Sequence, residues 1–226
     1  MNGSGDVVRE AVQIPAADIT IEGDLVVPPS AAGLVIFAHG SGSSRFSRRN
    51  RAVADVLSDG GFATLLLDLL TRREEALDQH SSQFRFDTER LASRVIAAID
   101  WTDEQGALAP LPIGCFGAST GAAAALMAAA ARPSRVRAVI SRGGRVDLAA
   151  DALPRVEAPT LLIVGAHDEP VLELNELARA RLRAPAQTVI VPGATHLFEE
   201  RGALEQVARL ALEWCRLYLR TDPSES

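Results

Sequence analysis

Lysine is absent from this chain of 226 residues, in which all 23 basic residues are arginines. Without lysine, the chain cannot form a side-chain Schiff base, use a Ser–Lys dyad or hold a nucleotide with a P-loop lysine. The two cysteines, Cys115 and Cys215, are too few and too far apart to indicate a disulfide framework or a metal site. We expect both to be buried, reduced thiols.

Long apolar runs and an excess of positive charge are also missing. No uninterrupted apolar stretch reaches the ~18 residues of a membrane span. The polar segment from Met1 to Glu10 lacks the apolar core of a signal peptide. The formal net charge of −6 argues against a nucleic-acid partner bound through its phosphates. We therefore expect a soluble, cytoplasmic protein with neither a membrane nor a nucleic acid as partner.

Length and composition favour one globular domain spanning residues 1–226. Hydrophobic residues make up 47% of the chain and charged residues 23%, which is ordinary for globular proteins. A chain of this length buries enough surface to build its own core.

Short apolar segments alternate with amphipathic ones along most of the chain. Continuous apolar runs predict buried strands over residues 33–39, 62–70, 112–118, 136–141, 160–165 and 188–191. Helical spacing predicts helices over residues 49–60, 88–104, 120–132, 171–182 and 204–219. Two alternating segments, 7–14 and 19–27, predict an antiparallel edge, and the polar residues 71–87 predict an irregular segment. The pattern predicts an α/β fold with a mostly parallel sheet of about eight strands and helices on both faces.

The segment Gly117-Ala-Ser-Thr-Gly121 lies where the third buried strand meets a helix. It matches the G-x-S-x-G pattern of a nucleophile elbow, a tight turn that lifts the serine hydroxyl above the sheet. The helix start behind the serine favours a developing negative charge. Ser119 is therefore the candidate nucleophile, and a glycine-rich turn with an idle serine is the plainer alternative.

An acidic residue and a histidine follow the last two buried strands, at the sheet edge where parallel sheets place their chemistry. Asp168 is the candidate for orienting a histidine, with Glu169 as the alternative. A helix-capping role for Asp168 is equally compatible with the sequence. His196 is the candidate general base. His167 is a rival, but beside Asp168 at a strand end it cannot easily reach Ser119.

Small residues follow the first buried strand in the segment Ala38-His-Gly-Ser-Gly-Ser-Ser44. Acyl transfer needs two N–H groups at the point where an oxyanion forms. We expect the backbone of Thr120 to supply one of them, and that of Ser41, or alternatively Gly42, to supply the other. His39 would then be structural and hold this loop.

The same glycines come close to a dinucleotide-binding fingerprint, with Asp68 at the end of the next strand. That alternative fails in two ways. Arg45 stands where the third glycine belongs, and the preceding strand is not the first of the chain.

Charged residues at the strand ends are candidates for substrate contacts. For Asp68, Asp147 and Arg142, the plain interpretation is a solvated or locally paired charge. An arginine over the pocket would select a carboxylate-bearing substrate. The sequence does not choose among Arg142, Arg145 and Arg85.

Aromatic residues are candidates for an apolar pocket wall. Phe84 and Phe86 lie in the polar segment 71–87, and Phe198 follows Leu197 after the candidate base. Packing in the core is the alternative for these phenylalanines. Together with Gly42 and Arg142, Phe198 completes the predicted substrate contacts.

With these residues in place, the chain resembles the α/β-hydrolases of the dienelactone-hydrolase-like group from about Val7 to Leu219. The resemblance rests on F-A-H-G-S-G at 37–42, G-A-S-T-G at 117–121, V-G-A-H-D at 164–168 and G-A-T-H at 193–196. It implies the α/β-hydrolase fold without a large lid domain, because the stretch 142–159 is short.

The resemblance also implies roles for individual residues. Ser119 would be the nucleophile, His196 the general base and Asp168 the orienting acid, with Ser41 and Thr120 as oxyanion donors. Dienelactone hydrolases have a cysteine at the elbow where this chain has serine, and this departure indicates a plain serine esterase instead.

The expected function is that of a serine hydrolase that cleaves small carboxylic esters or lactones through an acyl-enzyme, with no metal or organic cofactor. A non-hydrolytic binding or regulatory module, or a cofactor-free perhydrolase or acyltransferase, are the alternatives on the same fold. The expected partner is a small molecule, and both a monomer and a homodimer fit the sequence.

Overall fold

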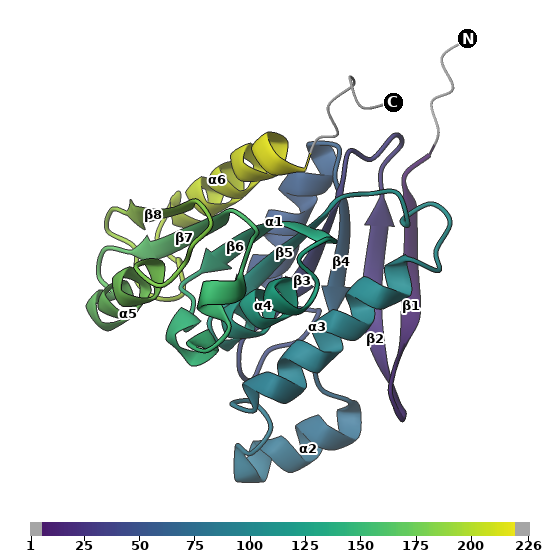
Figure 1. Ribbon diagram of the computed structural model, residues 1–226, viewed down its shortest axis with the longest axis horizontal. Helices are drawn as coiled ribbons and strands as arrows, with labels where there is room; N and C mark the ends of the chain where they lie inside the picture. Colours follow the sequence, from purple (N-terminus) through teal and green to yellow (C-terminus); the bar gives the residue numbers. More distant parts are fainter. Residues whose placement is uncertain (1–5, 220–226) are drawn as a thin grey trace.

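A sheet of eight strands crosses the molecule, with helices on both faces (Figure 1). The computed structural model describes residues 6–219, so the predictions for the first five residues and for the polar tail from 220 onward lie outside the described residues. The strands are β1 (Val8–Ala16), β2 (Ile19–Val27), β3 (Leu34–Ala38), β4 (Ala63–Leu67), β5 (Ile113–Ala118), β6 (Val136–Arg142), β7 (Thr160–Gly165) and β8 (Ala186–Val191).

Six helices accompany these strands. They are α1 (Arg48–Asp59), α2 (Arg72–Ser81), α3 (Thr88–Thr102), α4 (Thr120–Ala131), α5 (Glu169–Arg179) and α6 (Ala203–Tyr218). Five of the six, all but α2, match predicted helices to within a few residues.

The strand order is β1-β2-β4-β3-β5-β6-β7-β8, and every pair from β4 to β8 is parallel. The strands β1 and β2 form an antiparallel hairpin that continues the sheet through an antiparallel β2–β4 pair. The predicted α/β fold, with a mostly parallel sheet and an antiparallel edge, is therefore confirmed. Because β3 to β8 run in one direction, the loops after them gather at one edge of the sheet.

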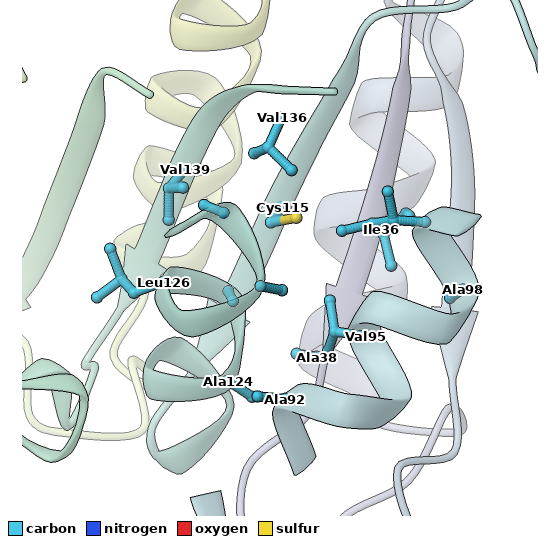
Figure 2. Close-up of a cluster of buried hydrophobic side chains, with 14 of the residues drawn as sticks. Ile36, Ala38, Ala92, Val95, Ala98, Cys115, Ala124, Leu126, Val136 and Val139 are labelled. Atoms are coloured by element: carbon cyan, nitrogen blue, oxygen red, sulfur yellow. The ribbon is translucent and has the colours of Figure 1, made fainter. Parts of the chain in front are cut away.

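The larger part of the core lies between the sheet and the helices α3 and α4 (Figure 2). Val95 of α3 and Leu126 of α4 are fully buried against Ile36, Cys115 and Val139 of the central strands. The helix α4 is an alanine-rich segment whose first turns are buried on nearly every side. Its short side chains allow its backbone to lie close to the sheet.

The opposite face of the sheet is covered by α1 and α6. Leu57 of α1 and Val207 of α6 are buried with Phe37 and Phe116, whose rings lie 4.8 Å apart. The two faces together bury the central strands completely, which explains why these strands read as continuous apolar runs.

The prediction of an irregular segment over residues 71–87 is wrong, because this segment contains α2. Thr71 and Glu74 form a reciprocal capping box at its start, in which each side chain accepts the backbone N–H of the other. Only Asp78 of this helix is buried. The segment therefore has no apolar stripe to reveal a helical period, but its T-x-x-E pattern is a helix-start signal that could have been used.

The connection between β6 and β7 carries only two short 3-10 helices, η1 (Val146–Ala149) and η2 (Leu153–Arg155). No large lid domain is inserted there, as the short segment predicted. Within residues 6–219, no helix is both long and apolar enough to cross a bilayer.

We expect Leu162→Ala to lower the free energy of unfolding by about 2–5 kcal/mol, because Leu162 of β7 is fully buried and its removal leaves a cavity. Leu177→Ala is the matched control, since this leucine on α5 is 62% exposed, and it should change stability by less than about 0.5 kcal/mol. Urea unfolding followed by circular dichroism measures both. Equal stabilities of the two variants would contradict the assigned core.

Both cysteines are free and buried, as predicted, and burial raises the pKa of each thiol to about 12. The reactive species is the thiolate, so the folded protein should react slowly with a disulfide reagent at pH 8. We expect both thiols to react at once in denaturant. Fast labelling of the folded protein would show that the packing around Cys115 and Cys215 is wrong.

Candidate active site

The turn between β5 and α4 places Ser119 at the carboxyl edge of the sheet in a strained conformation, with φ 50° and ψ −123°. A side chain on Gly117 would collide with the backbone of Ala122, and one on Gly121 would collide with the carbonyl oxygens of Ala38 and His39. Only glycine fits at both positions. The backbone N–H of Ser119 donates to a carbonyl of the neighbouring strand β6 at 3.2 Å, which holds the turn against the sheet.

A chain of hydrogen bonds runs from Ser119 through His196 to Asp168. The Ser119 hydroxyl lies 3.3 Å from Nε2 of His196, and Nδ1 of His196 lies 2.6 Å from a carboxylate oxygen of Asp168. The carboxylate is only an acceptor, so Nδ1 carries the proton. In the neutral imidazole Nε2 then accepts the serine hydroxyl, which is the tautomer that a general base needs.

The rival residues do not take part in this chain. Glu169 is exposed at the first position of α5. His167 is also exposed, and its backbone N–H donates to the carbonyl of Ala194, so its backbone holds the two loops after β7 and β8 together. The structure thus brings Asp168 and His196, rather than Glu169 and His167, to the predicted nucleophile.

Ser41 and Thr120, the predicted oxyanion donors, come from different strand ends and lie side by side. Their hydroxyl oxygens are 3.1 Å apart. Thr120 is the first residue of α4, where backbone N–H groups have no acceptor inside the helix. The neighbouring Gly42 has φ +66°, a conformation that glycine adopts without strain.

His39 holds the start of the loop that carries Ser41 and Gly42. Its Nε2 accepts the backbone N–H of Leu69 at 3.0 Å, so the proton sits on Nδ1, which donates to the carbonyl of Gly40 at 2.9 Å. Burial lowers the pKa of His39 below its ordinary value, and the neutral form therefore persists. This arrangement agrees with the structural role expected for His39.

Arg45 fastens the far end of the loop. Its backbone N–H donates to Asp68 at 2.7 Å, and its guanidinium forms ion pairs with Asp68, Asp24 (3.2 Å) and Glu22 (2.6 Å). Asp68 is thus occupied by an arginine of the loop. This pairing gives Asp68 a structural partner and leaves the dinucleotide interpretation without its acidic residue.

Two cavities meet at this loop. The larger cavity has a volume of about 220 Å³ and is lined by Ser119 and His196. Its other lining residues include Ser47, Arg49, Asn50 and Arg142. A smaller cavity of about 100 Å³ lies on the other side of the loop, beside Gly42 and Thr120.

Sequence reasoning missed Ser47, Arg49 and Asn50. They form the start of α1, directly after the small-residue loop, at the edge where the other candidate residues gather. The start of a helix that follows a candidate loop is the sequence signal that could have identified them.

The three arginines that the sequence could not separate have different partners. Arg85 forms an ion pair with Asp78 at 2.6 Å, and Arg145 forms one with Asp147 at 2.8 Å. Arg142 forms no ion pair with a carboxylate among residues 6–219 and lines the larger cavity. Burial, followed by the repulsion of Arg49, lowers the pKa of Arg142 to about 10.

The prediction that Phe198 forms the pocket wall is wrong. Its ring is 1% exposed and packs in the core on the α1 and α6 side of the sheet. Leu197, one residue before it, is exposed and lines the cavity. Phe84 packs under the Arg90 guanidinium, while Phe86 is exposed, and neither lines the two cavities described here. Within residues 6–219, no cluster of three His, Cys, Asp or Glu side chains suits a metal ion.

The family model described as "Dienelactone hydrolase family" matches residues 21–218. The chain belongs to the dienelactone hydrolase family. A crystal structure of dienelactone hydrolase from Anabaena variabilis is 54% identical, covers 95% of this chain and 99% of its own, and superposes with a TM-score of 0.93. The protein Est1E of Butyrivibrio proteoclasticus is 19% identical, with a TM-score of 0.74 over 91% of this chain and 99% of its own, and shares the fold.

One curated relative of this chain has a name that refers to a different activity. A protein of Mycobacterium tuberculosis (strain H37Rv), called "Putative phosphoribosyl transferase", is 57% identical over 205 residues. The match covers 91% of this chain but 45% of the relative. The chain therefore spans less than half the length of the curated protein it matches.

We expect Gly121→Ala to lower the melting temperature, because its methyl group would collide with the carbonyls of Ala38 and His39. We expect the free energy of unfolding to fall by about 1–3 kcal/mol, and each kcal/mol to lower the melting temperature by roughly 2–4 °C. Alanine is otherwise favoured over glycine inside a helix, so a loss isolates the collision.

The control is Gly106→Ala, since nothing lies within 4 Å of a side chain at Gly106. Differential scanning calorimetry compares the two variants. A Gly121→Ala protein as stable as Gly106→Ala would contradict the close packing of the elbow.

Proposed function

We propose that this chain is a serine hydrolase that cleaves small carboxylic esters or lactones through an acyl-enzyme. The observation that carries the proposal is the hydrogen-bonded chain from Ser119 through His196 to Asp168, at a strained elbow ahead of a helix. Membership of the dienelactone hydrolase family supports hydrolytic chemistry.

In the first step, His196 takes the proton of the Ser119 hydroxyl as its oxygen attacks the ester carbonyl. The backbone N–H groups of Thr120 and Ser41 stabilise the oxyanion. The C–O bond to the alcohol then breaks, and His196 returns the proton to the leaving oxygen. In the second step, a water gives a proton to His196 and its oxygen attacks the acyl carbon. The bond from this carbon to Ser119 Oγ then breaks, His196 returns the proton to Oγ, and the acid leaves.

Asp168 acts through His196. Its carboxylate fixes the Nδ1–H tautomer and stabilises the imidazolium that forms in each step. These three side chains and one water account for every proton in the cycle. The short connection between β6 and β7 leaves the site without a large cover, which suits small substrates.

The substrate would occupy the two cavities on either side of the small-residue loop. Arg142 borders the larger cavity and Gly42 the smaller one, so both remain proposed substrate contacts. The name of the mycobacterial relative describes a protein of which the match covers 45%. For this chain, the hydrogen bond between Ser119 and His196 supports acyl transfer rather than phosphoribosyl transfer.

We expect Ser119→Ala to reduce kcat/KM for p-nitrophenyl acetate and butyrate by roughly 10³-fold or more, because the nucleophile is lost. The matched control is Ser93→Ala, an exposed serine on α3, which should keep wild-type rates.

Equal turnover by the wild type and Ser119→Ala would reject the serine mechanism. Turnover by neither protein would favour the binding-module alternative. Product analysis with hydrogen peroxide or an alcohol present separates hydrolysis from perhydrolase and acyltransferase activity.

A further inference from the structure

Asn175 on α5 is a fully buried polar side chain that has no part in the proposed reaction cycle. Its amide nitrogen donates one proton to the carbonyl of Gly144 and the other to the carbonyl of Val171, each at 2.8 Å. The reversed amide would set its oxygen against two carbonyl oxygens, so these bonds fix which way the group points. The bond to Val171 stays within α5, whereas the bond to Gly144 crosses to the loop after β6.

The buried amide is unfavourable for stability in one respect. Its oxygen, Oδ1, is buried and has no hydrogen-bond partner within residues 6–219. An unpaired buried acceptor lowers stability, and a leucine of similar volume would fill the same space without one. What a leucine could not supply is the hydrogen bond from α5 to Gly144.

The loop that this amide holds contacts two residues of the hydrogen-bonded chain. We call Gly143, Gly144 and Arg145 the β6 loop. The backbone N–H of Arg145 donates to the carbonyl of Ser119 at 3.0 Å. A Cβ on Gly143, which has φ +54°, would lie 3.2 Å from the carbonyl oxygen of His196 and 3.4 Å from its Nδ1. The backbone of the β6 loop therefore lies directly against His196 and against the nucleophile turn.

The remaining residue of the chain, Asp168, lies at the start of the helix that carries Asn175. Asp168 is the N-cap of α5, and its carbonyl accepts the N–H of Leu172 at 2.9 Å. About two helical turns separate Asp168 from Asn175. The helix also packs against η1, which follows the β6 loop. One side chain thus joins the helix that begins after Asp168 to the loop that contacts the other two residues.

We propose that Asn175 is a positioning residue of the candidate active site. Through its bond to Gly144 it holds the β6 loop, and the loop keeps the His196 ring in line with its two partners. Asn175 lines neither of the two cavities described above, so its loss should lower kcat and leave KM nearly unchanged. This inference rests on the proposed hydrolase function and adds to it a residue outside the catalytic side chains.

The first test is Asn175→Leu, which removes the amide at similar volume. We expect kcat for p-nitrophenyl butyrate to fall about tenfold or more and KM to change by less than about threefold, because a small displacement of the reacting groups slows the chemical step. Asn175→Ser separates the two hydrogen bonds, since a serine hydroxyl reaches the carbonyl four residues earlier but not Gly144. It should lower kcat in the same way, and it carries the test if Asn175→Leu does not fold.

The matched control is Thr160→Val, at the start of β7 and so at the opposite edge of the sheet from the candidate site. Thr160 is fully buried, and its hydroxyl donates to the carbonyl of Ala158 at 3.0 Å. This variant also loses a buried hydrogen bond, so its melting temperature should fall while kcat stays at the wild-type value. Rates are compared at a temperature at which circular dichroism shows every variant folded. An equal loss of kcat in Thr160→Val would reduce the effect to stability and overturn the positioning role.

A spectroscopic readout tests the same role without turnover. The proton on Nδ1 of His196, held against Asp168 at 2.6 Å, should give a far-downfield proton resonance that is lost in His196→Gln. We expect this resonance to shift or broaden in Asn175→Leu and to stay in place in Thr160→Val.

The failures of the two proposals are distinguishable. Ser119-dependent turnover with an unchanged kcat in the folded Asn175 variants, or with a change in KM alone, would overturn the positioning role and leave the hydrolase proposal standing. If the wild type turns over no ester, the hydrolase proposal fails and the resonance decides. The positioning role is then rejected if the wild type lacks the signal or if the Asn175 variants leave it unchanged.

Discussion

The close approach of two backbone segments beside Ser119, the start of α4 and the end of β3, determines where the groups of the candidate site lie. Gly121 at the start of α4 rests against the carbonyl oxygens of Ala38 and His39, at the point where β3 ends and the Ser41 loop begins. One contact therefore positions the nucleophile turn and the loop relative to each other. The positive φ of Ser119 costs free energy, and the parallel neighbours of β5 on both sides over-determine the turn and maintain it.

The alanine-rich helix α4 follows from the same requirement. It is packed between the sheet, α3 and η1, and residues Ala122–Ala125 are fully buried. Alanine combines a high helix propensity with the smallest side chain that has a Cβ, so the helix axis can lie close to β5. A helix with larger residues would stand further from the sheet, and its N-terminus would no longer lie directly behind Ser119.

The elements and site residues that depend on a local sequence pattern could be predicted from the sequence. Features that depend on packing between segments far apart in the sequence could not. Buried strands were readable because both of their faces are covered, and Ser119, Asp168 and His196 were placed at one edge because parallel strands end there. The helix α2 was missed because it buries only Asp78 and has no apolar stripe. Whether Phe198 faces the core or the pocket depends on α1 and α6, which are remote in sequence. The pairing of Arg85 with Asp78 and of Arg145 with Asp147, and the position of Arg142 at the cavity, also depend on the folded structure.

Arg45 gives the antiparallel edge a function beyond closing the sheet. It links the loop that carries Ser41 to Glu22 and Asp24 on β2 and to Asp68 after β4. The hairpin β1–β2 contributes none of the proposed catalytic side chains, yet its acidic outer positions hold one end of the loop. A minimal fragment that retained only the six parallel strands would keep Ser119, Asp168 and His196 but release this anchor. Circular permutation or a fusion at the β1–β2 edge would therefore act on the geometry of the proposed oxyanion donors from outside the parallel sheet.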